Sequence, residues 1–231
     1  MPSVYLIPSL LHNEGLTSIP SNVLSAIRDC QVFFVENERT TRRYFKMLWK
    51  EMVIDDYEWH TIHKAEDSVK QIFTRRITEG KNLGIVSEAG CPGIADPGQV
   101  LVAAAHQAGA TVKPLVGPSS ILLALMASGM NGQQFRFIGY LPIDPKERAQ
   151  MISDLENESI RKNCTQIFIE TPYRNNQMME SLLASCRAST RICIAADLTA
   201  TGESVKTLPV SEWKKQTPQL HKRLVIFLLH G

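Results

Sequence analysis

Residues 87–98 read Ser-Glu-Ala-Gly-Cys-Pro-Gly-Ile-Ala-Asp-Pro-Gly, between a strand pattern at 83–87 and a helical pattern at 99–107. Three glycines and two prolines within nine of these residues, 90–98, define a rigid path whose backbone N–H and C=O groups stay exposed. A loop that leads from a strand to a helix lies at the carboxyl edge of a parallel sheet, where α/β proteins bind ligands. We therefore expect the loop 87–98 to hold a ligand with its main-chain atoms.

Known nucleotide motifs do not account for this loop. The chain contains no Gly-x-Gly-x-x-Gly, so a dinucleotide site of the Rossmann type has no support. Gly93 and Gly98 have the glycine spacing of a P-loop, but Gln99-Val100 replace the Lys and Ser/Thr that phosphate and magnesium require. The sequence is therefore not that of an NTPase.

Short strand patterns alternate with helical patterns along the chain. β-Branched and aromatic runs predict strands at 4–7, 32–35, 83–87, 111–116, 136–141, 166–170, 191–195 and 224–229. Helical patterns lie between them at 22–29, 66–79, 99–107 and 121–127. This alternation predicts an α/β protein with mostly parallel or mixed sheets. Gly117-Pro118 can turn sharply, so we expect two α/β domains, 1–116 and 117–231.

Composition excludes several classes of protein. The chain of 231 residues is 44% hydrophobic and 21% charged, which is ordinary for a soluble globular protein. Its net charge of +2 means that any basic surface must be local. The N-terminus lacks the pattern of a signal peptide, and no segment approaches the roughly 18 apolar residues that span a bilayer. We expect a cytoplasmic protein with no membrane contact.

The cysteines and histidines do not indicate a metal site. The five cysteines are odd in number, scattered, and form no Cys-x-x-Cys pair, which argues against a disulfide framework and against zinc. His60 and His63 are close in sequence, but no nearby cysteine completes a ligand set. We expect reduced thiols and no metal.

Two acidic residues of the loop 87–98 each allow two explanations. Asp96 precedes Pro97-Gly98, the pattern of a helix N-cap followed by proline at the first helical position. Asp96 is therefore either a cap only, or a cap that also faces the ligand. Glu88 follows a strand and has no helix to cap, so its carboxylate either bonds a ribose or amine of the ligand or is simply solvated.

Five stretches, in the same order, resemble the motifs of one family. Residues 86–98 resemble Ser-Asp-Ala-Gly-Thr-Pro-x-x-Ser-Asp-Pro-Gly, and residues 117–120 with 127–129 resemble Gly-Pro-Ser-Ala followed by Ala-Ser-Gly. Residues 36–42 resemble Glu-Asp-Thr-Arg-x-Thr-Arg, residues 137–142 resemble Phe-x-Gly-Phe-Leu-Pro, and residues 170–174 resemble Glu-Ser-Pro-His-Arg. The family is that of the tetrapyrrole methylases, and within it the branch of small-subunit ribosomal RNA ribose 2'-O-methyltransferases.

The resemblance implies a fold, a cofactor and partners. It implies two α/β domains with S-adenosylmethionine in the cleft between them, usually in a homodimer, and ribosomal RNA or the small ribosomal subunit as the partner. Carried over position by position, it implies cofactor contacts at Leu11, Glu88, Ala89, Gly90, Cys91, Ser119, Ser120, Ile121, Glu170, Ala196 and Asp197. Arg174, in the last motif, is carried over as a substrate contact.

Departures from the family motifs leave the substrate open. The first loop, residues 8–16, differs from Pro-Thr-Pro-Ile-Gly-Asn-Leu-x-Asp, and Glu88 stands where Asp is usual. Residues 196–200 lack both basic groups of the family's Arg-Glu-Leu-Thr-Lys. Two alternatives to RNA ribose methylation therefore remain: methylation of a small molecule such as a corrin-type tetrapyrrole, and cofactor binding without catalysis.

Methyl transfer from a sulfonium to a ribose hydroxyl requires few protein groups. The protein must align the nucleophile with the methyl carbon and exclude water, and a general base assists because a hydroxyl is a poor nucleophile. Glu36 and Asp96 are the candidate bases, and Arg39 is the candidate that orients a phosphate or carboxylate.

A helix that starts near Arg39 places five cations within about 100° of one another on one face. This basic stripe consists of Arg39, Arg42, Arg43, Lys46 and Lys50. The remaining, core-facing side carries Tyr44, Phe45, Leu48, Trp49 and Met52. Because the net charge is only +2 and no acid lies within the stripe, we expect it to contact RNA phosphates. The alternative is a solvated helix face.

Overall fold

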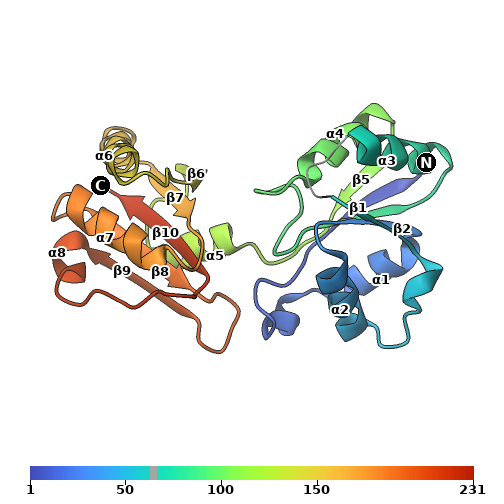
Figure 1. Cartoon of the computed structure of the whole chain (residues 1–231), viewed down its shortest axis with the longest axis horizontal. Coiled ribbons are helices and arrows are strands. Elements are labelled where there is room, and N and C mark those ends of the chain that lie inside the picture. The colour runs from blue at the N-terminus through green and yellow to red at the C-terminus, as the bar shows by residue number, and fades with distance from the viewer. Residues whose placement is uncertain (63–66) are drawn as a thin grey trace. The chain divides into compact units, whose positions relative to one another are not determined.

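The computed structural model describes residues 1–62 and 67–231, which form two compact units, Met1–Ser119 and Ser120–Gly231. Each unit has its own five-stranded sheet covered by helices, as Figure 1 shows. The α/β fold expected from the alternating pattern is therefore confirmed. The boundary expected after residue 116 lies three residues before the division that the structure makes after Ser119.

The sheet of the first unit is entirely parallel and has the strand order β3-β2-β4-β1-β5. Its strands are β1 (Ser3–Ile7), β2 (Val32–Val35), β3 (Glu58–Thr61), β4 (Leu83–Val86) and β5 (Thr111–Pro114). Because every strand runs the same way, the loops that follow β1, β2, β4 and β5 all leave from one edge of the sheet. This carboxyl edge is where the expected ligand loop 87–98 begins.

Helices cover both faces of this sheet, with α3 and α4 on one side and α1 and α2 on the other (Figure 1). They are α1 (Asn22–Asp29), α2 (Glu38–Leu48), α3 (Asp67–Thr78) and α4 (Gly98–Gln107), with short 3-10 turns at Gly15–Ser18 and Ile54–Asp56. Phe33 and Phe34 are neighbours on β2, so they point to opposite faces and enter different cores. A sheet that is buried on both faces explains why its central strands are continuous apolar runs.

The sheet of the second unit is mixed and has the order β6-β7-β10-β8-β9. Its strands are β6 (Phe135–Tyr140), β7 (Thr165–Ile169), β8 (Arg191–Ala196), β9 (Ser204–Pro209) and β10 (Val225–His230). Only the β6–β7 pair is parallel, while β10 pairs antiparallel with β7 and β8, and β8 with β9. The sequence predicted mostly parallel or mixed sheets, and the sheet of this unit is mixed.

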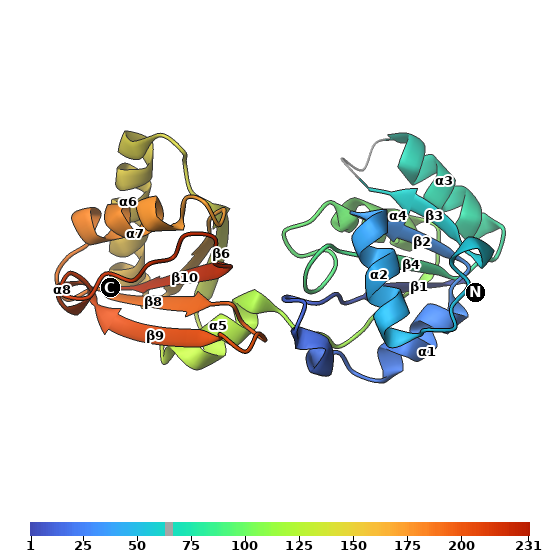
Figure 2. The same ribbon diagram turned by 60° about the horizontal axis from the view of Figure 1, so that its bottom comes forward.

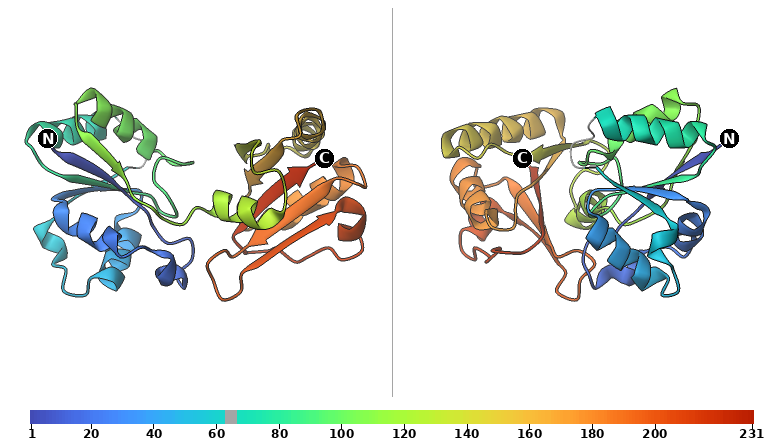
Figure 3. Two further views of the ribbon diagram at one scale, coloured as in Figure 1. Left: turned by 180° about the vertical axis from the view of Figure 1, so that it is seen from behind. Right: turned by 45° about the vertical axis from the view of Figure 1, so that its right-hand side comes forward.

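Four helices accompany this sheet: α5 (Ser120–Ser128), α6 (Pro145–Lys162), α7 (Asn175–Ser185) and α8 (Val210–Trp213). The α6 and α7 helices pack over Phe168 and Phe227, whose rings stack with centroids 5.8 Å apart. Figures 2 and 3 show α5 on the face of the sheet opposite α7. No helix in the described part of the chain is long and apolar enough to cross a membrane.

The eight expected strands are all present, with ends within two residues of their expected positions. The edge strands β3 and β9 had no expected counterpart. The helix expected at 66–79 is seen as α3, while its expected first residue, Glu66, lies outside the described residues.

Candidate functional site

Gly90 is the point at which three loops of the carboxyl edge meet. Its carbonyl oxygen accepts hydrogen bonds from the Ser9 backbone N–H at 2.8 Å and from the Ser87 hydroxyl at 3.0 Å. Its φ of +74° lies in the left-handed region, and a Cβ there would sit 3.2 Å from Leu11 Cδ2 and 3.3 Å from Pro118 O. The loops after β1, β4 and β5 therefore converge on this glycine, and only glycine leaves the space between them open.

Asp96 closes the loop on itself, which corrects the expected helix cap. Its carboxylate accepts from Gly93 N at 2.9 and 3.0 Å and from Gly98 N at 2.7 Å. The α4 helix begins at Gly98, and its N-cap position is Pro97, which makes no side-chain cap hydrogen bond, so Asp96 bonds the first helical N–H from one position before the N-cap. The pattern Asp-Pro-Gly thus does not place Asp96 at the N-cap, because its carboxylate also reaches back to Gly93 and holds the turn. Partial burial raises the pKa of Asp96, which outweighs the lowering by its two backbone donors.

Glu36 joins the loop after β2 to the loop after β4. Its Oε1 accepts from the Glu88 backbone N–H at 2.7 Å. Burial is the main reason that the pKa of Glu36 is raised, and the negative charges of Asp96 and Glu88 raise it further. The two candidate bases are therefore electrostatic neighbours, while Glu88 and the adjacent Ala89 remain exposed.

Tyr44 is a residue of this edge that the sequence did not single out. It lies on α2 and, as expected, in the core, but its hydroxyl donates to Pro8 O at 2.9 Å. Burial raises the pKa of this hydroxyl. The bond ties α2 to the first loop, and no local pattern could have indicated it because 36 positions separate the partners.

Cys91 faces the loop after β5. Its Sγ lies 3.6 Å from Gly117 O and 3.5 Å from Pro118 O, and burial raises the pKa of the thiol. Ser119 is the last residue of the first unit, whereas Ser120 and Ile121 open α5 in the second. The cofactor candidates of the first unit, Leu11 and 88–91, thus share one edge with Glu36 and Asp96.

The two acidic cofactor candidates of the second unit, Glu170 and Asp197, each form an ion pair with an arginine. Glu170, which follows β7, accepts from Arg174 Nη2 at 2.6 Å and from Thr171 N at 2.6 Å. Asp197, which follows the buried Ala196 of β8, bonds Arg223 Nε at 2.6 Å and accepts from Leu224 N at 2.9 Å. Both carboxylates therefore have protein partners, and Arg174 points to Glu170.

The basic stripe is smaller than expected. The α2 helix ends at Leu48, so the expected place of Lys50 on the same helix face is wrong. The face also carries an acid, because Glu38 forms an ion pair with Arg42. The Arg42 guanidinium in addition lies 5.1 Å from the centre of the Trp59 ring. Lys46 donates to the carbonyl oxygens of Lys50 and Met52, which follow the helix.

Two cations of the stripe, Arg39 and Arg43, remain exposed and form no ion pair within residues 1–62 and 67–231. The core-facing side is as expected: Tyr44, Phe45 and Met52 are buried, and Leu48 and Trp49 pack against them. The amphipathic helix is therefore present, with a reduced basic face.

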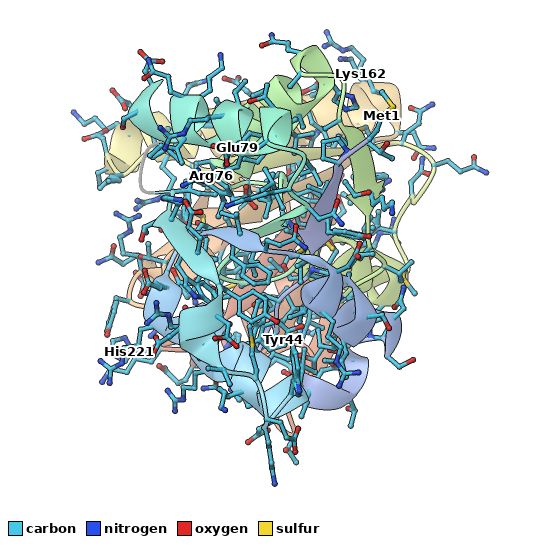
Figure 4. The ribbon with its side chains drawn as sticks, turned by 90° about the vertical axis from the view of Figure 1, so that its right-hand side faces the viewer. Met1, Tyr44, Arg76, Glu79, Lys162 and His221 are labelled. Atoms are coloured by element: carbon cyan, nitrogen blue, oxygen red, sulfur yellow. The ribbon has the colours of Figure 1, made fainter. Side chains whose placement is uncertain are left out.

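The described residues contain no group of three or more His, Cys, Asp or Glu that could hold a metal. His60, on β3, lies 2.6 Å from Glu58 Oε1, and the pKa of Glu58 is lowered to about 2 because hydrogen bonds from Arg76 and His60 outweigh its burial. Figure 4 shows Arg76 close to Glu79, with which it also pairs. His63 lies outside the described residues.

Comparison with known proteins gives consistent matches over the whole chain. The model of the tetrapyrrole (corrin/porphyrin) methylases matches residues 15–214. The ribosomal RNA small subunit methyltransferase I of Vibrio cholerae is 29% identical over 100% of this chain and 77% of its own length. The protein of the same name from Escherichia coli O157:H7 is 28% identical over 99% of this chain and 77% of its own. The crystal structure of the methyltransferase CobJ has the same fold, with a TM-score of 0.66 over 100% of this chain and 95% of that one at 16% identity.

Proposed function

The chain belongs to the tetrapyrrole (corrin/porphyrin) methylase family, and on this premise we propose that it methylates a ribose 2'-hydroxyl of small-subunit ribosomal RNA with S-adenosylmethionine. Membership of this family makes the chain a methyltransferase. We propose RNA as the substrate because two relatives named for small-subunit ribosomal RNA match nearly the whole chain.

The carboxyl edge of the first unit fits the proposed cofactor. Gly90 keeps open the space between Leu11 and Pro118, which a Cβ would enter. Glu88 presents an exposed carboxylate beside that space, suited to the amine or the ribose hydroxyls of a nucleoside amino acid. When bound, the cofactor would supply a methyl group attached to a sulfonium, and the sulfur is a good leaving group because it departs as a neutral thioether. The expectation that Glu170, Ala196 and Asp197 also contact it stays a prediction.

Glu36 is the better of the two candidate bases. Its carboxylate uses Oε1 for the Glu88 N–H, and its raised pKa brings it closer to neutrality, where a general base is most effective. Asp96 already accepts from two backbone donors, so its role is to hold the loop 93–98 in shape. In this mechanism Glu36 accepts the proton of the attacking hydroxyl, the loop excludes water, and Arg39 orients a phosphate of the substrate.

Mass spectrometry of ribosomal RNA from a strain that lacks the gene tests this function. We expect one ribose methyl group to be missing from the small-subunit RNA and to return when the wild-type gene, but not its Glu36→Ala variant, is restored. A fully methylated RNA in the deletion strain would contradict the proposal. Turnover of a corrin-type substrate by the purified protein would instead support small-molecule methylation, and binding without any turnover would support the non-catalytic alternative.

A homodimer is part of the same proposal. The α5 helix buries Ala124, Leu125 and Ser128 against its own unit. Met126 of the same helix is 78% exposed and Leu122 is 48% exposed. An apolar helix with large exposed side chains is typical of a surface that a second subunit covers.

A further inference from the structure

Two loops of the second unit present an aromatic pair to solvent. Tyr173, in the loop between β7 and α7, is 69% exposed, and its ring meets that of His221 edge-on, with centroids 5.8 Å apart. His221, labelled in Figure 4, lies in the segment between α8 and β10 and is also exposed. An edge-on contact leaves a face of the tyrosine ring open. Single exposed aromatic rings are ordinary on protein surfaces, but here two rings lie together beside the cation Lys222.

The backbone beneath this pair is held rigidly. The Lys222 N–H donates to Pro172 O at 2.9 Å, which joins the two loops directly. Asn175, which is fully buried, donates from Nδ2 to Leu220 O at 3.4 Å and to Arg223 O at 2.8 Å. Figure 2 shows the segment leading into β10 running beside α7, where these contacts form. The two loops therefore form one preorganised surface.

Lys222 occupies an unusual backbone conformation on this surface. Its φ is +64°, in the left-handed region that residues other than glycine rarely adopt. Strain of this kind persists only where surrounding contacts impose it, and it is concentrated at functional sites. Lys222 is exposed and forms no ion pair with any residue that the structure describes.

The surrounding charges are arranged so that cations face solvent. In the Arg174–Glu170 pair, the arginine side chain is 28% exposed and the glutamate 1%. In the Arg223–Asp197 pair, the arginine is 31% exposed and the aspartate 22%. In both pairs the guanidinium is the more exposed partner, but each pair is neutral overall, so the uncompensated positive charge among these residues is that of Lys222.

We propose that Tyr173, His221 and Lys222, together called the Tyr173 platform, bind single-stranded RNA, with an unpaired base stacked on Tyr173 and a phosphate at Lys222. Exposed aromatic rings beside cations are the means by which proteins bind unpaired nucleotides, because every base has a face to stack and every nucleotide a phosphate. The proposal rests on the proposed RNA substrate and adds a binding surface to it.

Fluorescence anisotropy with the full chain and a labelled, unstructured RNA of about 12 nucleotides tests the platform. Tyr173→Ala should weaken binding roughly tenfold to hundredfold, and Tyr173→Trp should restore it, because stacking needs only an aromatic ring. Lys222→Asn, which tolerates the left-handed backbone, should lower the slope of log affinity against log salt by about 0.7, whereas Tyr173→Ala should leave that slope unchanged. Tyr140→Ala is the matched control, because Tyr140 is 61% exposed in the same unit.

The outcomes separate this inference from the proposed function. Wild-type protein that binds the RNA while Tyr173→Ala and Lys222→Asn bind it equally well would overturn the platform alone. An equal loss in Tyr140→Ala would also overturn it, since the effect would not be specific to the platform. A wild-type protein that does not bind this RNA would overturn the platform, whereas the methylation of ribosomal RNA in the deletion strain tests the proposed substrate separately. Affinity for S-adenosylhomocysteine should be the same in all four variants.

Discussion

Gly90 and Gly109 share a left-handed backbone, with φ of +74° and +70°, but only Gly90 has neighbours within 4 Å of a built Cβ. Alanine at either position should cost about 1–2 kcal/mol of stability through backbone strain. At Gly90 it should also push apart Leu11 and Pro118 and weaken S-adenosylhomocysteine binding roughly tenfold or more, because small displacements in a site are costly. Calorimetric titration of Gly90→Ala and Gly109→Ala distinguishes strain from crowding.

Valine at Gly90 should abolish binding while the chain still folds. Circular dichroism spectra that match the wild type would show that the loss is local. Equal affinities in Gly90→Ala and Gly109→Ala would remove Gly90 from the cofactor site.

Glu36 gives the first unit a dependence on pH that can be measured. Below its usual pKa, Glu36 is protonated in both the folded and the unfolded chain and does not affect the change of stability with pH. As the pH rises past that value, the unfolded chain loses its proton first, because the folded pKa is raised, and the free energy of unfolding falls. Glu36→Gln keeps the acceptor for Glu88 N but cannot ionise.

The stability of Glu36→Gln relative to wild type should therefore increase with pH between the usual and the raised pKa of Glu36, and then stay constant. Urea unfolding at a series of pH values, followed by tryptophan fluorescence, measures this difference. A difference that is independent of pH would mean that Glu36 is not desolvated in the folded protein. Loss of methylation in the same variant, with cofactor binding intact, would support its role as the base.

At the scale of elements, strands buried on both faces were predictable, whereas two of the four edge strands, β3 and β9, were not. β2 and β4 are fully buried, so their apolar runs stand out in the sequence. β3 reads Glu-Trp-His-Thr and is half-buried at every position, and β9 is exposed or half-buried throughout. An edge strand pairs on one side only and needs no continuous apolar run, so neither pattern was distinctive.

The dipeptide Asp-Pro occurs before two helices, with different results. Asp144 caps α6 by accepting from Lys146 N and Glu147 N, with proline in the first turn. Asp96 has the same sequence signal, but Gly93 lies three residues before it and offers a competing donor. Local sequence therefore predicted a cap where the structure has a closed loop. The same limit applies to Tyr44, since its bond to Pro8 depends on how α2 packs.

The α2 helix should contact RNA through Arg39 and Arg43 rather than through the whole stripe. Reversing both to Glu should lower the salt slope of binding to single-stranded RNA by about 1.4, since each lost contact removes about 0.7. Arg42→Glu should instead lower stability, because Arg42 pairs with Glu38 and packs on Trp59. Anisotropy at several salt concentrations measures the first effect, and urea unfolding measures the second.

Lys70→Glu with Arg75→Glu, a double reversal on α3 of the same unit, is the matched control for net charge. If this control lowers the slope as much as the α2 variant does, the effect comes from overall charge and α2 is a solvated face.

For the whole molecule, local sequence patterns predicted the α/β fold class and a chain of two α/β units, but the site depends on contacts between distant segments. Gly90 is bonded to Ser9 and lies against Leu11 and Pro118, and Glu36 bonds a residue 52 positions away. Such contacts follow from the order β2-β4-β1-β5 of the parallel sheet, which brings these four loops to one edge. Periodicity indicates strands, but it does not specify their order.

The proposed homodimer makes the final prediction at this scale. Sedimentation at micromolar concentration should give a mass of two chains, each of 25.9 kDa. If α5 lies in the interface, Met126→Glu should shift the protein to the monomer, because burying an unpaired carboxylate costs far more than the interface gains from one methionine. Val53→Glu is the control: Val53 is 55% exposed and belongs to the first unit, whereas α5 belongs to the second, and its substitution should leave the dimer intact. A wild-type monomer would contradict the dimer itself, whereas a dimer that persists in Met126→Glu would place its interface elsewhere than α5.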